Sequence, residues 1–332
     1  MSRPRVTNFA DYSAPFGLSN PHLQSVLASN RVRKQLMFRR ARTLMELSAP
    51  VDIVLEDGVH LRGFHAPVPT PSRGLVIFIH GWEGSADSQY VLSAARMLHA
   101  EGYQIFRLNL RDHGGTTHLN EDLFHSCRID EVVAAVSWLT RRYAAPRYFL
   151  AGFSLGGNFA LRVAARAPAA GIKLDRVIAV CPVLNPANTM RALERGAWIY
   201  RYYFLTKWRR SLTAKAQAFP NLYEFGDLRR LPTLTATTEY FVEYHTPFPS
   251  LAAYLNGYAI VEDALARLEV PAKVVLASDD PVIPVADLSR LASSPSLEVV
   301  VTKHGGHCGF LSGPSLDSWI DTHIVDDIYA HC

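Results

Sequence analysis

The chain has 332 residues, of which 48% are hydrophobic, and it carries 34 Lys and Arg residues against 30 Asp and Glu residues. This apolar content is sufficient for a packed core and excludes wholesale disorder, and at about 100–200 residues per domain the length predicts one large or two ordinary domains. Four scattered cysteines without a C-x-x-C pair argue against a disulfide scaffold or a cysteine-rich zinc module: Cys127, Cys181, Cys308 and Cys332.

Residues 1–50 are predicted to form a basic arm that packs on the core. The first 45 residues hold one acidic residue, Asp11, and eight basic ones: Arg3, Arg5, Arg31, Arg33, Lys34, Arg39, Arg40 and Arg42. Such a segment could bind anionic lipid or nucleic acid. Because no RNA-binding signature, zinc finger or basic zipper accompanies it, no nucleic-acid partner is expected, whereas peripheral membrane contact stays open. With no signal-peptide pattern and no membrane-spanning run, a cytoplasmic location is expected.

Regular elements follow the arm in an alternating order. Residues 51–67 contain two extended runs around Asp57 and Gly58, a pattern typical of a β-hairpin. Short apolar runs then predict buried strands at 74–80, 104–110, 147–153, 176–183, 273–278 and 297–303. Helical spacing predicts helices at 88–103, 130–144, from the Gly-rich turn after 153 to about 167, and from about 315 to the C-terminus.

This alternation predicts an α/β fold with a mostly parallel central sheet and helices on both faces. The alternation is interrupted once, between residues 184 and 250, where no strand pattern occurs and the aromatic, basic stretch 198–210 stands. We expect this segment to form an inserted helical cap. The core is then assigned to residues 51–183 and 251–332.

The strongest chemical motif is G-x-S-x-G at Gly152–Gly156, between a predicted strand and a predicted helix. In that context the motif forms a tight turn that exposes the serine hydroxyl above the sheet. Ser154 is therefore the predicted nucleophile.

A serine nucleophile needs a base, and the base needs an acid that orients it. In this fold the acid and the histidine follow later strands, in that chain order. The strand at 273–278 ends at Asp279 and Asp280, and we prefer Asp280 because the rigid turn that begins at Pro281 follows it, with Asp279 as the alternative. The last strand ends in a Gly-rich loop, where we prefer His307 to His304.

The developing oxyanion needs two preorganised backbone donors. One is expected from the N–H of Leu155, directly after the nucleophile. The other is expected from the N–H of Trp82, in the loop that follows the strand at 74–80. Glu83 in that loop is expected to bond to its neighbours.

Several stretches beyond the GFSLGGN elbow carry a family resemblance: NPHLQSVLAS (20–29), HGWEGSADSQYV (80–91), NLRDHGG (109–115), FHS (124–126), ASDDP and HGGHCGF. They resemble the α/β-hydrolase fold, and more narrowly the YheT-like family related to abhydrolase-domain proteins 1 and 3. The resemblance implies the same nucleophile, acid and base. The chain departs from the family at residues 111–114, Arg-Asp-His-Gly, which adds a titratable pair near the predicted pocket, and in a longer, more aromatic segment at 239–265.

The sequence thus predicts a serine hydrolase that cleaves carboxylic esters through an acyl-enzyme, without cofactor or metal. One alternative is a phospholipase or acyltransferase that acts on lipid esters, since His125 and Asp130 have the H-x-x-x-x-D spacing of lipid acyltransferases, although Asp130 is expected at a helix start. Another is a non-catalytic binding protein on a hydrolase scaffold. The substrate is expected to be a small-molecule or lipid ester, and the oligomeric state is not predicted.

Overall fold

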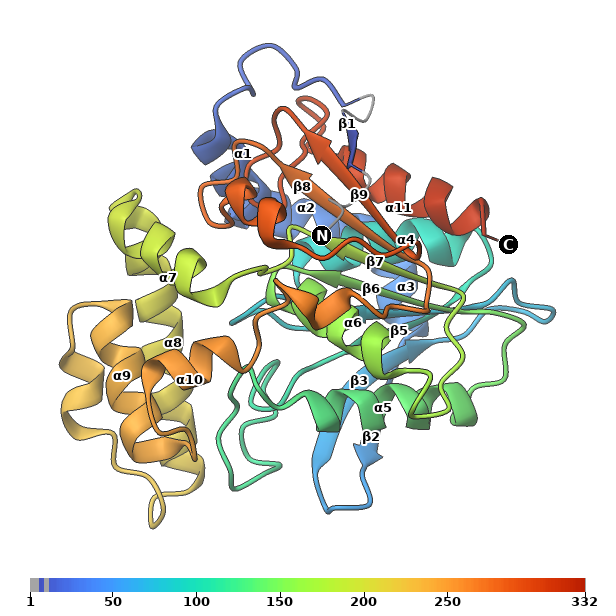
Figure 1. Ribbon diagram of the computed structural model, residues 1–332. Helices are drawn as coiled ribbons and strands as arrows, with labels where there is room; N and C mark the ends of the chain where they lie inside the picture. The colour runs from blue at the N-terminus through green and yellow to red at the C-terminus, as the bar shows by residue number, and fades with distance from the viewer. Residues whose placement is uncertain (1–5, 9–11, 332) are drawn as a thin grey trace.

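The computed structural model of the chain describes residues 6–8 and 12–331. Arg3, Arg5 and Asp11 of the basic arm, and Cys332, lie outside the described residues. Within the described part, nine strands form one sheet in the order β1-β9-β8-β7-β6-β4-β5-β3-β2 (Figure 1). The strands are β1 (Val6–Asn8), β2 (Ala49–Val54), β3 (His60–Ala66), β4 (Leu75–Ile79), β5 (Gln104–Leu108), β6 (Tyr148–Phe153), β7 (Arg176–Val180), β8 (Ala272–Ala277) and β9 (Leu297–Thr302).

The order of strands confirms the predicted α/β architecture. From β5 through β4, β6, β7, β8 and β9 to β1, neighbouring strands pair in parallel. Strands β2 and β3 form the predicted antiparallel hairpin, and Gly58 takes a φ of +82° in its turn. The short parallel edge strand β1 was not predicted, because three residues with one apolar side chain have no readable periodicity.

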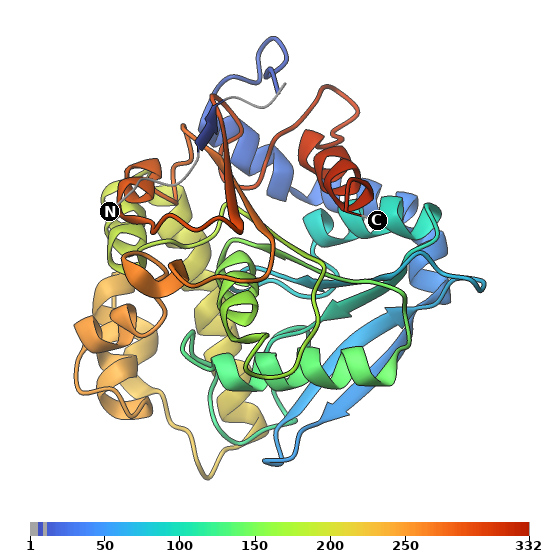
Figure 2. The ribbon, with the colours of Figure 1, turned by 45° about the vertical axis from the view of Figure 1, so that its right-hand side comes forward.

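Helices cover both faces of the sheet (Figure 2). One layer contains α5 (Ile129–Arg142) and α6 (Leu155–Arg166), and the opposite layer contains α2 (Arg31–Arg40), α3 (Arg42–Leu47), α4 (Gln89–Ala100) and α11 (Trp319–Tyr329). Every side chain of β4 is buried, and alternate residues enter different apolar clusters: Leu75, Ile77 and Ile79 in one, Val76 and Phe78 in the other. The continuous apolar run in the sequence therefore reflects a strand covered on both sides.

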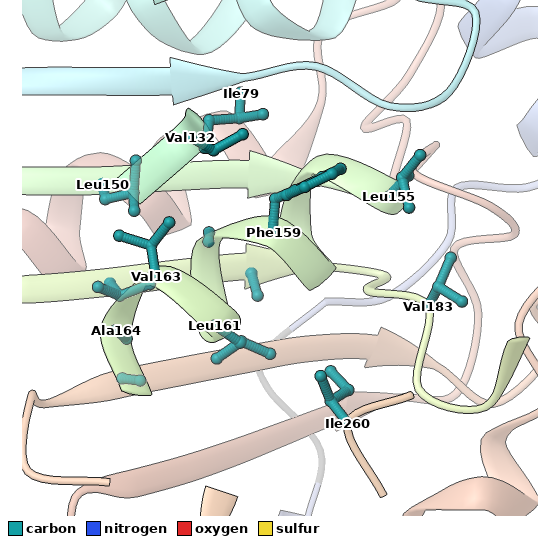
Figure 3. Close-up of a cluster of buried hydrophobic side chains, with 14 of the residues drawn as sticks. Ile79, Val132, Leu150, Leu155, Phe159, Leu161, Val163, Ala164, Val183 and Ile260 are labelled. Atoms are coloured by element: carbon teal, nitrogen blue, oxygen red, sulfur yellow. The ribbon is translucent and has the colours of Figure 1, made fainter. Parts of the chain in front are cut away.

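The first of these apolar clusters includes Leu155, the residue after Ser154. Figure 3 shows Phe159 and Val163 of α6 beside Ile79 of β4 and Leu150 of β6. Because the side chains of the helix and of the strands pack between one another, the position of the N-terminal end of α6 on the sheet is fixed.

The N-terminal helices place two of the basic side chains against protein. Helix α1 (Pro21–Ser29) precedes α2, on which Arg33 is 1% exposed and donates to the carbonyls of Ala28 and Leu316. Arg40 pairs with Asp317 at 2.6 Å. Arg33 and Arg40 therefore bond to other parts of the protein.

Six helical elements lie between β7 and β8, the last of which is the 3₁₀ turn η2 (Asp263–Leu265). The four helices and the 3₁₀ turn before it are grouped on one side of the molecule in Figure 1. They are α7 (Pro186–Arg195), α8 (Trp198–Ala218), η1 (Gly226–Arg230), α9 (Leu234–His245) and α10 (Leu251–Asn256), so that the helical segment continues past residue 250. We call α7–α10 the cap. The cap has its own apolar cluster, which includes Leu212, Phe225 and Phe241. Among the described residues, no helix has the length and apolar character needed to cross a membrane.

Candidate active site

Ser154 stands at the sharp turn between β6 and α6. Its φ of +53° and ψ of −118° are rare for a residue with a Cβ, and such strain is typical of a nucleophile elbow. The flanking glycines are required by close approach: a Cβ at Gly152 would lie 2.2 Å from the carbonyl oxygen of Gly156, and one at Gly156 would lie 2.3 Å from that of Ile79. The motif therefore brings the helix onto the sheet and leaves the serine projecting from it.

The structure brings together three of the residues singled out from the sequence. The Nε2 atom of His307 lies 3.0 Å from the Oγ atom of Ser154, and its Nδ1 atom lies 2.9 Å from the Oδ2 atom of Asp280. The side chain of Asp280 is fully buried, and its other oxygen accepts from the backbone amides of Val282 and Ile283. The turn predicted after Asp280 thus holds this carboxylate in place.

Electrostatics favour the protonated form of the imidazole. Burial by itself lowers the pKa of His307, but the nearby Asp280 charge, the Cys308 side chain and the hydrogen bond that the imidazole donates to Asp280 outweigh burial and raise the pKa to about 9. The buried Asp280 charge therefore stabilises the imidazolium that forms when the ring holds a proton.

The neighbouring acid and histidine form a different pair. Asp279 lies 3.2 Å from the Nδ1 atom of His304, and its other oxygen accepts from the amide of Gly306 at 2.9 Å. Asp279 therefore holds the loop that carries His307 without touching that imidazole. Of the two candidate acids and the two candidate histidines, Asp280 and His307 are therefore the ones connected to Ser154 by hydrogen bonds.

The loop after β4 lies directly against the nucleophile. A Cβ at Gly81 would lie 3.2 Å from the Cβ of Ser154. Within the described ranges, the backbone N–H groups of Trp82 and Leu155 donate to no protein acceptor. An oxyanion site requires two unpartnered amides beside the nucleophile, and these two amides follow Gly81 and Ser154 in the chain.

The cap holds this loop in place. The carbonyl of Glu83 accepts from Nζ of Lys207 at 2.9 Å, and the Glu83 carboxylate accepts from the hydroxyl of Ser211 at 2.6 Å. Trp82 packs against Phe204 and Trp208 of the same helix, with ring centroids 5.2 and 5.4 Å away. Glu83 therefore bonds to its surroundings, as the sequence predicted, and helix α8 orients the candidate oxyanion donor.

Helix α1 supports the histidine loop, a role that sequence reasoning missed. The hydroxyl of Ser25 accepts from the backbone N–H of His307 at 2.8 Å. The side chain of Gln24 accepts from the N–H of Leu311 and donates to the hydroxyl of Tyr12. The stretch NPHLQSVLAS, quoted above for its family resemblance, was the available signal.

A cavity opens above Ser154 between the core and the cap. It holds about 830 Å³ of empty space, part of it open to solvent. Among the described residues, its lining includes no Asp, Glu, Lys or Arg side chain, and it is mostly apolar and aromatic: Trp82, Phe124, Leu155, Val183, Pro186, Met190, Leu193, Phe204, Trp208, Leu234, Phe241, Tyr254, Tyr258 and Val282. Such a lining suits an uncharged apolar group.

Of the remaining sequence candidates, one lines this cavity and the others lie elsewhere. His125 lines it, and burial lowers the pKa of its imidazole to about 4. Asp130 is in the first turn of α5, as expected for a carboxylate at a helix N-terminus. The titratable residues of segment 111–114, Asp112 and His113, both bond to other parts of the protein. Asp112 pairs with Lys215 of the cap at 2.9 Å, and His113 accepts from the N–H of Glu83.

Comparison with known proteins agrees with this architecture. YheT of Escherichia coli (strain K12) is 23% identical over 335 residues, which cover 96% of this chain and 92% of that protein. Monoacylglycerol lipase ABHD2 of Danio rerio is 26% identical over 220 residues, covering 61% of this chain and 52% of that protein. Among solved structures, the esterase Pf2001 of Pyrococcus furiosus superposes with a TM-score of 0.56 at 17% identity, over 85% of this chain and 92% of that one.

The sequence profile of the α/β hydrolase fold matches residues 74–314, which is most of the chain. The matched range begins just before β4 and includes the elbow, the cap and the histidine loop. The chain therefore belongs to the α/β hydrolase fold family, within its YheT-like group.

Proposed function

We propose that the chain is a serine hydrolase that cleaves carboxylic esters, with Ser154 as nucleophile, His307 as general base and acid, and Asp280 as the residue that orients and stabilises the imidazole. The observation that carries this proposal is the unbroken hydrogen-bonded series from Ser154 through His307 to Asp280 at the base of an apolar cavity. Three groups in this arrangement perform acyl transfer on several unrelated folds.

In the proposed reaction, the Ser154 hydroxyl attacks the ester carbonyl carbon while His307 takes its proton. The negative charge that develops on the carbonyl oxygen is stabilised by the backbone N–H groups of Trp82 and Leu155. His307 then protonates the departing alkoxide, which leaves as an alcohol, and the acyl group remains on Ser154. A water molecule, deprotonated by His307, hydrolyses this acyl-enzyme and releases the acid.

The cavity favours lipid esters within this class. An apolar lining without formal charges would accept an acyl chain and would disfavour a charged acyl group, because burying an unpaired charge is costly. ABHD2 is named as a monoacylglycerol lipase, and a further relative from Mus musculus as a phospholipase. A neutral glycerol ester is therefore our preferred substrate, with a glycerophospholipid as the alternative.

Fluorophosphonate labelling tests the mechanism. The wild-type protein should incorporate the probe and hydrolyse aryl esters, and Ser154→Ala should lose both properties while it stays folded by circular dichroism. Ser289→Ala is a matched control, because this exposed serine donates only to the carbonyl of Ala286. Undiminished turnover by Ser154→Ala would refute the proposal, and a folded wild-type protein that neither labels nor turns over would favour a binding protein.

An assay that varies the head group separates the substrate classes. Monoacylglycerols and glycerophospholipids with matched acyl chains are incubated with the protein, and released fatty acid is measured with and without acyl-CoA. Release from the monoacylglycerol alone supports the preferred substrate. Appearance of a transferred acyl chain would identify an acyltransferase.

A further inference from the structure

Two cysteine thiols lie beside the imidazole of His307. Cys181 directly follows β7, and Cys308 directly follows His307 in the chain. The two Sγ atoms and a ring nitrogen of His307 all lie within 4.8 Å of one another. Cys181 thus lies at the end of one strand, and His307 and Cys308 lie in the loop after β9, so that the fold itself brings them together.

We propose that Cys181, Cys308 and His307 bind a thiophilic divalent metal ion, with Zn²⁺ or Cd²⁺ as the class, and that occupancy of this site blocks catalysis. From the sequence we expected no metal, since the cysteines are far apart in the chain and show no ligand spacing. The metal site stands on the geometry of the three side chains. The block on catalysis also rests on the function proposed for His307.

The separations suit a single ion after a small adjustment. Zinc lies about 2.3 Å from a thiolate sulfur and about 2.0–2.1 Å from an imidazole nitrogen, so two ligands of one tetrahedral ion are roughly 3.5–3.8 Å apart. The three atoms here lie at or inside 4.8 Å. Side-chain rotations that draw them together by about 1 Å would complete three of four ligand positions, and a water or the Ser154 hydroxyl could supply the fourth.

The two thiols hydrogen-bond to each other, and each also makes one long contact with a backbone carbonyl. Cys181 contacts the carbonyl of Gly306 at 4.0 Å and Cys308 contacts that of Val180 at 3.9 Å, both at the long limit for a sulfur donor. Both cysteines are unpaired by disulfides and buried. A metal ion would therefore replace weak hydrogen bonds of sulfur with two metal–thiolate bonds.

Charge balance favours a divalent ion here. Binding of the two thiols follows M²⁺ + 2 Cys–SH → M(S–Cys)₂ + 2 H⁺, with both protons released to solvent, and a protonated His307 ring releases one further proton before its nitrogen binds the ion. The ion and the two thiolates sum to zero, so that the buried site gains no net charge. A monovalent or trivalent ion would leave an uncompensated charge in a region where that is costly.

Occupancy would remove the proposed base. Both ring nitrogens of His307 are engaged, one with Ser154 and the other with Asp280. A metal at either nitrogen displaces one of these contacts. Loss of the first removes the proton acceptor from the nucleophile, and loss of the second removes the acid that orients the ring, so both arrangements block proton transfer.

Cadmium titration of the full-length, reduced protein tests the site without reference to activity. Cadmium bound to thiolates absorbs in the ultraviolet, and the wild-type protein should show this absorption with one ion per chain. Cys308→Ala and Cys181→Ala should weaken binding at least about tenfold, because even changes to the partners of metal ligands cost about 10–100-fold in affinity. Cys127→Ala should bind like the wild type, since Cys127 contacts the carbonyl of Tyr254 elsewhere in the fold.

Ester hydrolysis with added Zn²⁺ tests the block on catalysis. The wild type and Cys127→Ala should be inhibited at least about tenfold more strongly than Cys308→Ala, and a chelator should restore activity. If Cys308→Ala does not fold, Cys308→Ser, which keeps the side-chain size, takes its place. Absence of the cadmium–thiolate band, or equal zinc sensitivity in all variants, would overturn the proposal. A normal band in a protein without esterase activity would refute the proposed function and leave the metal site standing.

Discussion

The buried lysine of the cap offers a direct test of how the cap is attached. Lys215 is 1% exposed, and its Nζ atom donates to the Asp112 carboxylate at 2.9 Å and to the carbonyls of Asn120 and Asp122. The other oxygen of Asp112 accepts from the N–H of Phe124. Lys215→Met keeps the length of the side chain but removes its charge and all three donated bonds.

The expected cost follows from the charge that is left behind. Removing one partner of a buried ion pair costs about 3–5 kcal/mol, because the remaining carboxylate stays buried without a counter-charge. Unfolding entropy is about 2.1 cal/mol/K per residue, or roughly 0.7 kcal/mol/K for a chain of this length, so the Tm should fall by about 4–7 °C. Since Asp112 no longer needs its partner once it is neutral, Asp112→Asn combined with Lys215→Met should cost less than the sum of the single changes.

Differential scanning calorimetry of the single and double variants measures this effect. Arg42→Met is the control, because the Arg42–Glu46 pair on α3 is solvent-exposed at 78% and 60%. An exposed pair contributes about 0–1 kcal/mol, so the Tm of this control should change by roughly 1 °C or less. If Lys215→Met lowered the Tm no more than Arg42→Met, the reasoning about the buried pair would be wrong.

Three further outcomes are expected. Asp280→Asn should lower kcat for aryl esters about 10⁴-fold, as at other triad acids, whereas Asp279→Asn should lower it far less, and equal losses would contradict our assignment of the acid. Ser211→Ala removes the hydrogen bond to Glu83 and should lower kcat about 10-fold or more with little change in KM, because a mispositioned oxyanion donor acts on the transition state. Burial raises the pKa of Asp321 from 3.8 to about 6, against the opposing effects of Arg33 and the Ser93 hydroxyl. The folded state therefore holds this proton more tightly than the unfolded state, and the resulting stabilisation is lost as the pH rises through about 6. Asparagine carries no titrating proton, so the free energy of unfolding of Asp321→Asn, measured in urea, should increase relative to that of the wild type by up to about 3 kcal/mol between about pH 4 and pH 8.

The sheet and the nucleophile turn were predictable because their signals are local. A strand buried on both faces needs a continuous apolar run, and a helix needs 3.6-residue periodicity, whatever the rest of the chain does. The glycines around Ser154 report a steric requirement at the turn itself. The edge strand β1 lacked such a signal, because its pairing with β9 depends on a surface formed nearly 300 residues later in the chain.

The sequence also determined which loops would meet, since parallel strands bring their carboxyl ends to one edge of the sheet. Which side chain of each loop faces the serine depended on tertiary contacts. Adjacent residues such as Asp279 and Asp280 share the same local signal, and only the amides of the following turn and the position of His307 distinguish them.

Contacts between distant segments were decided by the tertiary structure alone. No periodicity links Ser25 to His307 or Ser211 to Glu83, because each pair joins surfaces that exist only after the sheet has formed. The same holds for the thiols of Cys181 and Cys308, more than 120 residues apart in the chain and adjacent in the fold. Composition and spacing determine the elements and their order, whereas side-chain partners across elements depend on packing, which a one-dimensional pattern does not contain.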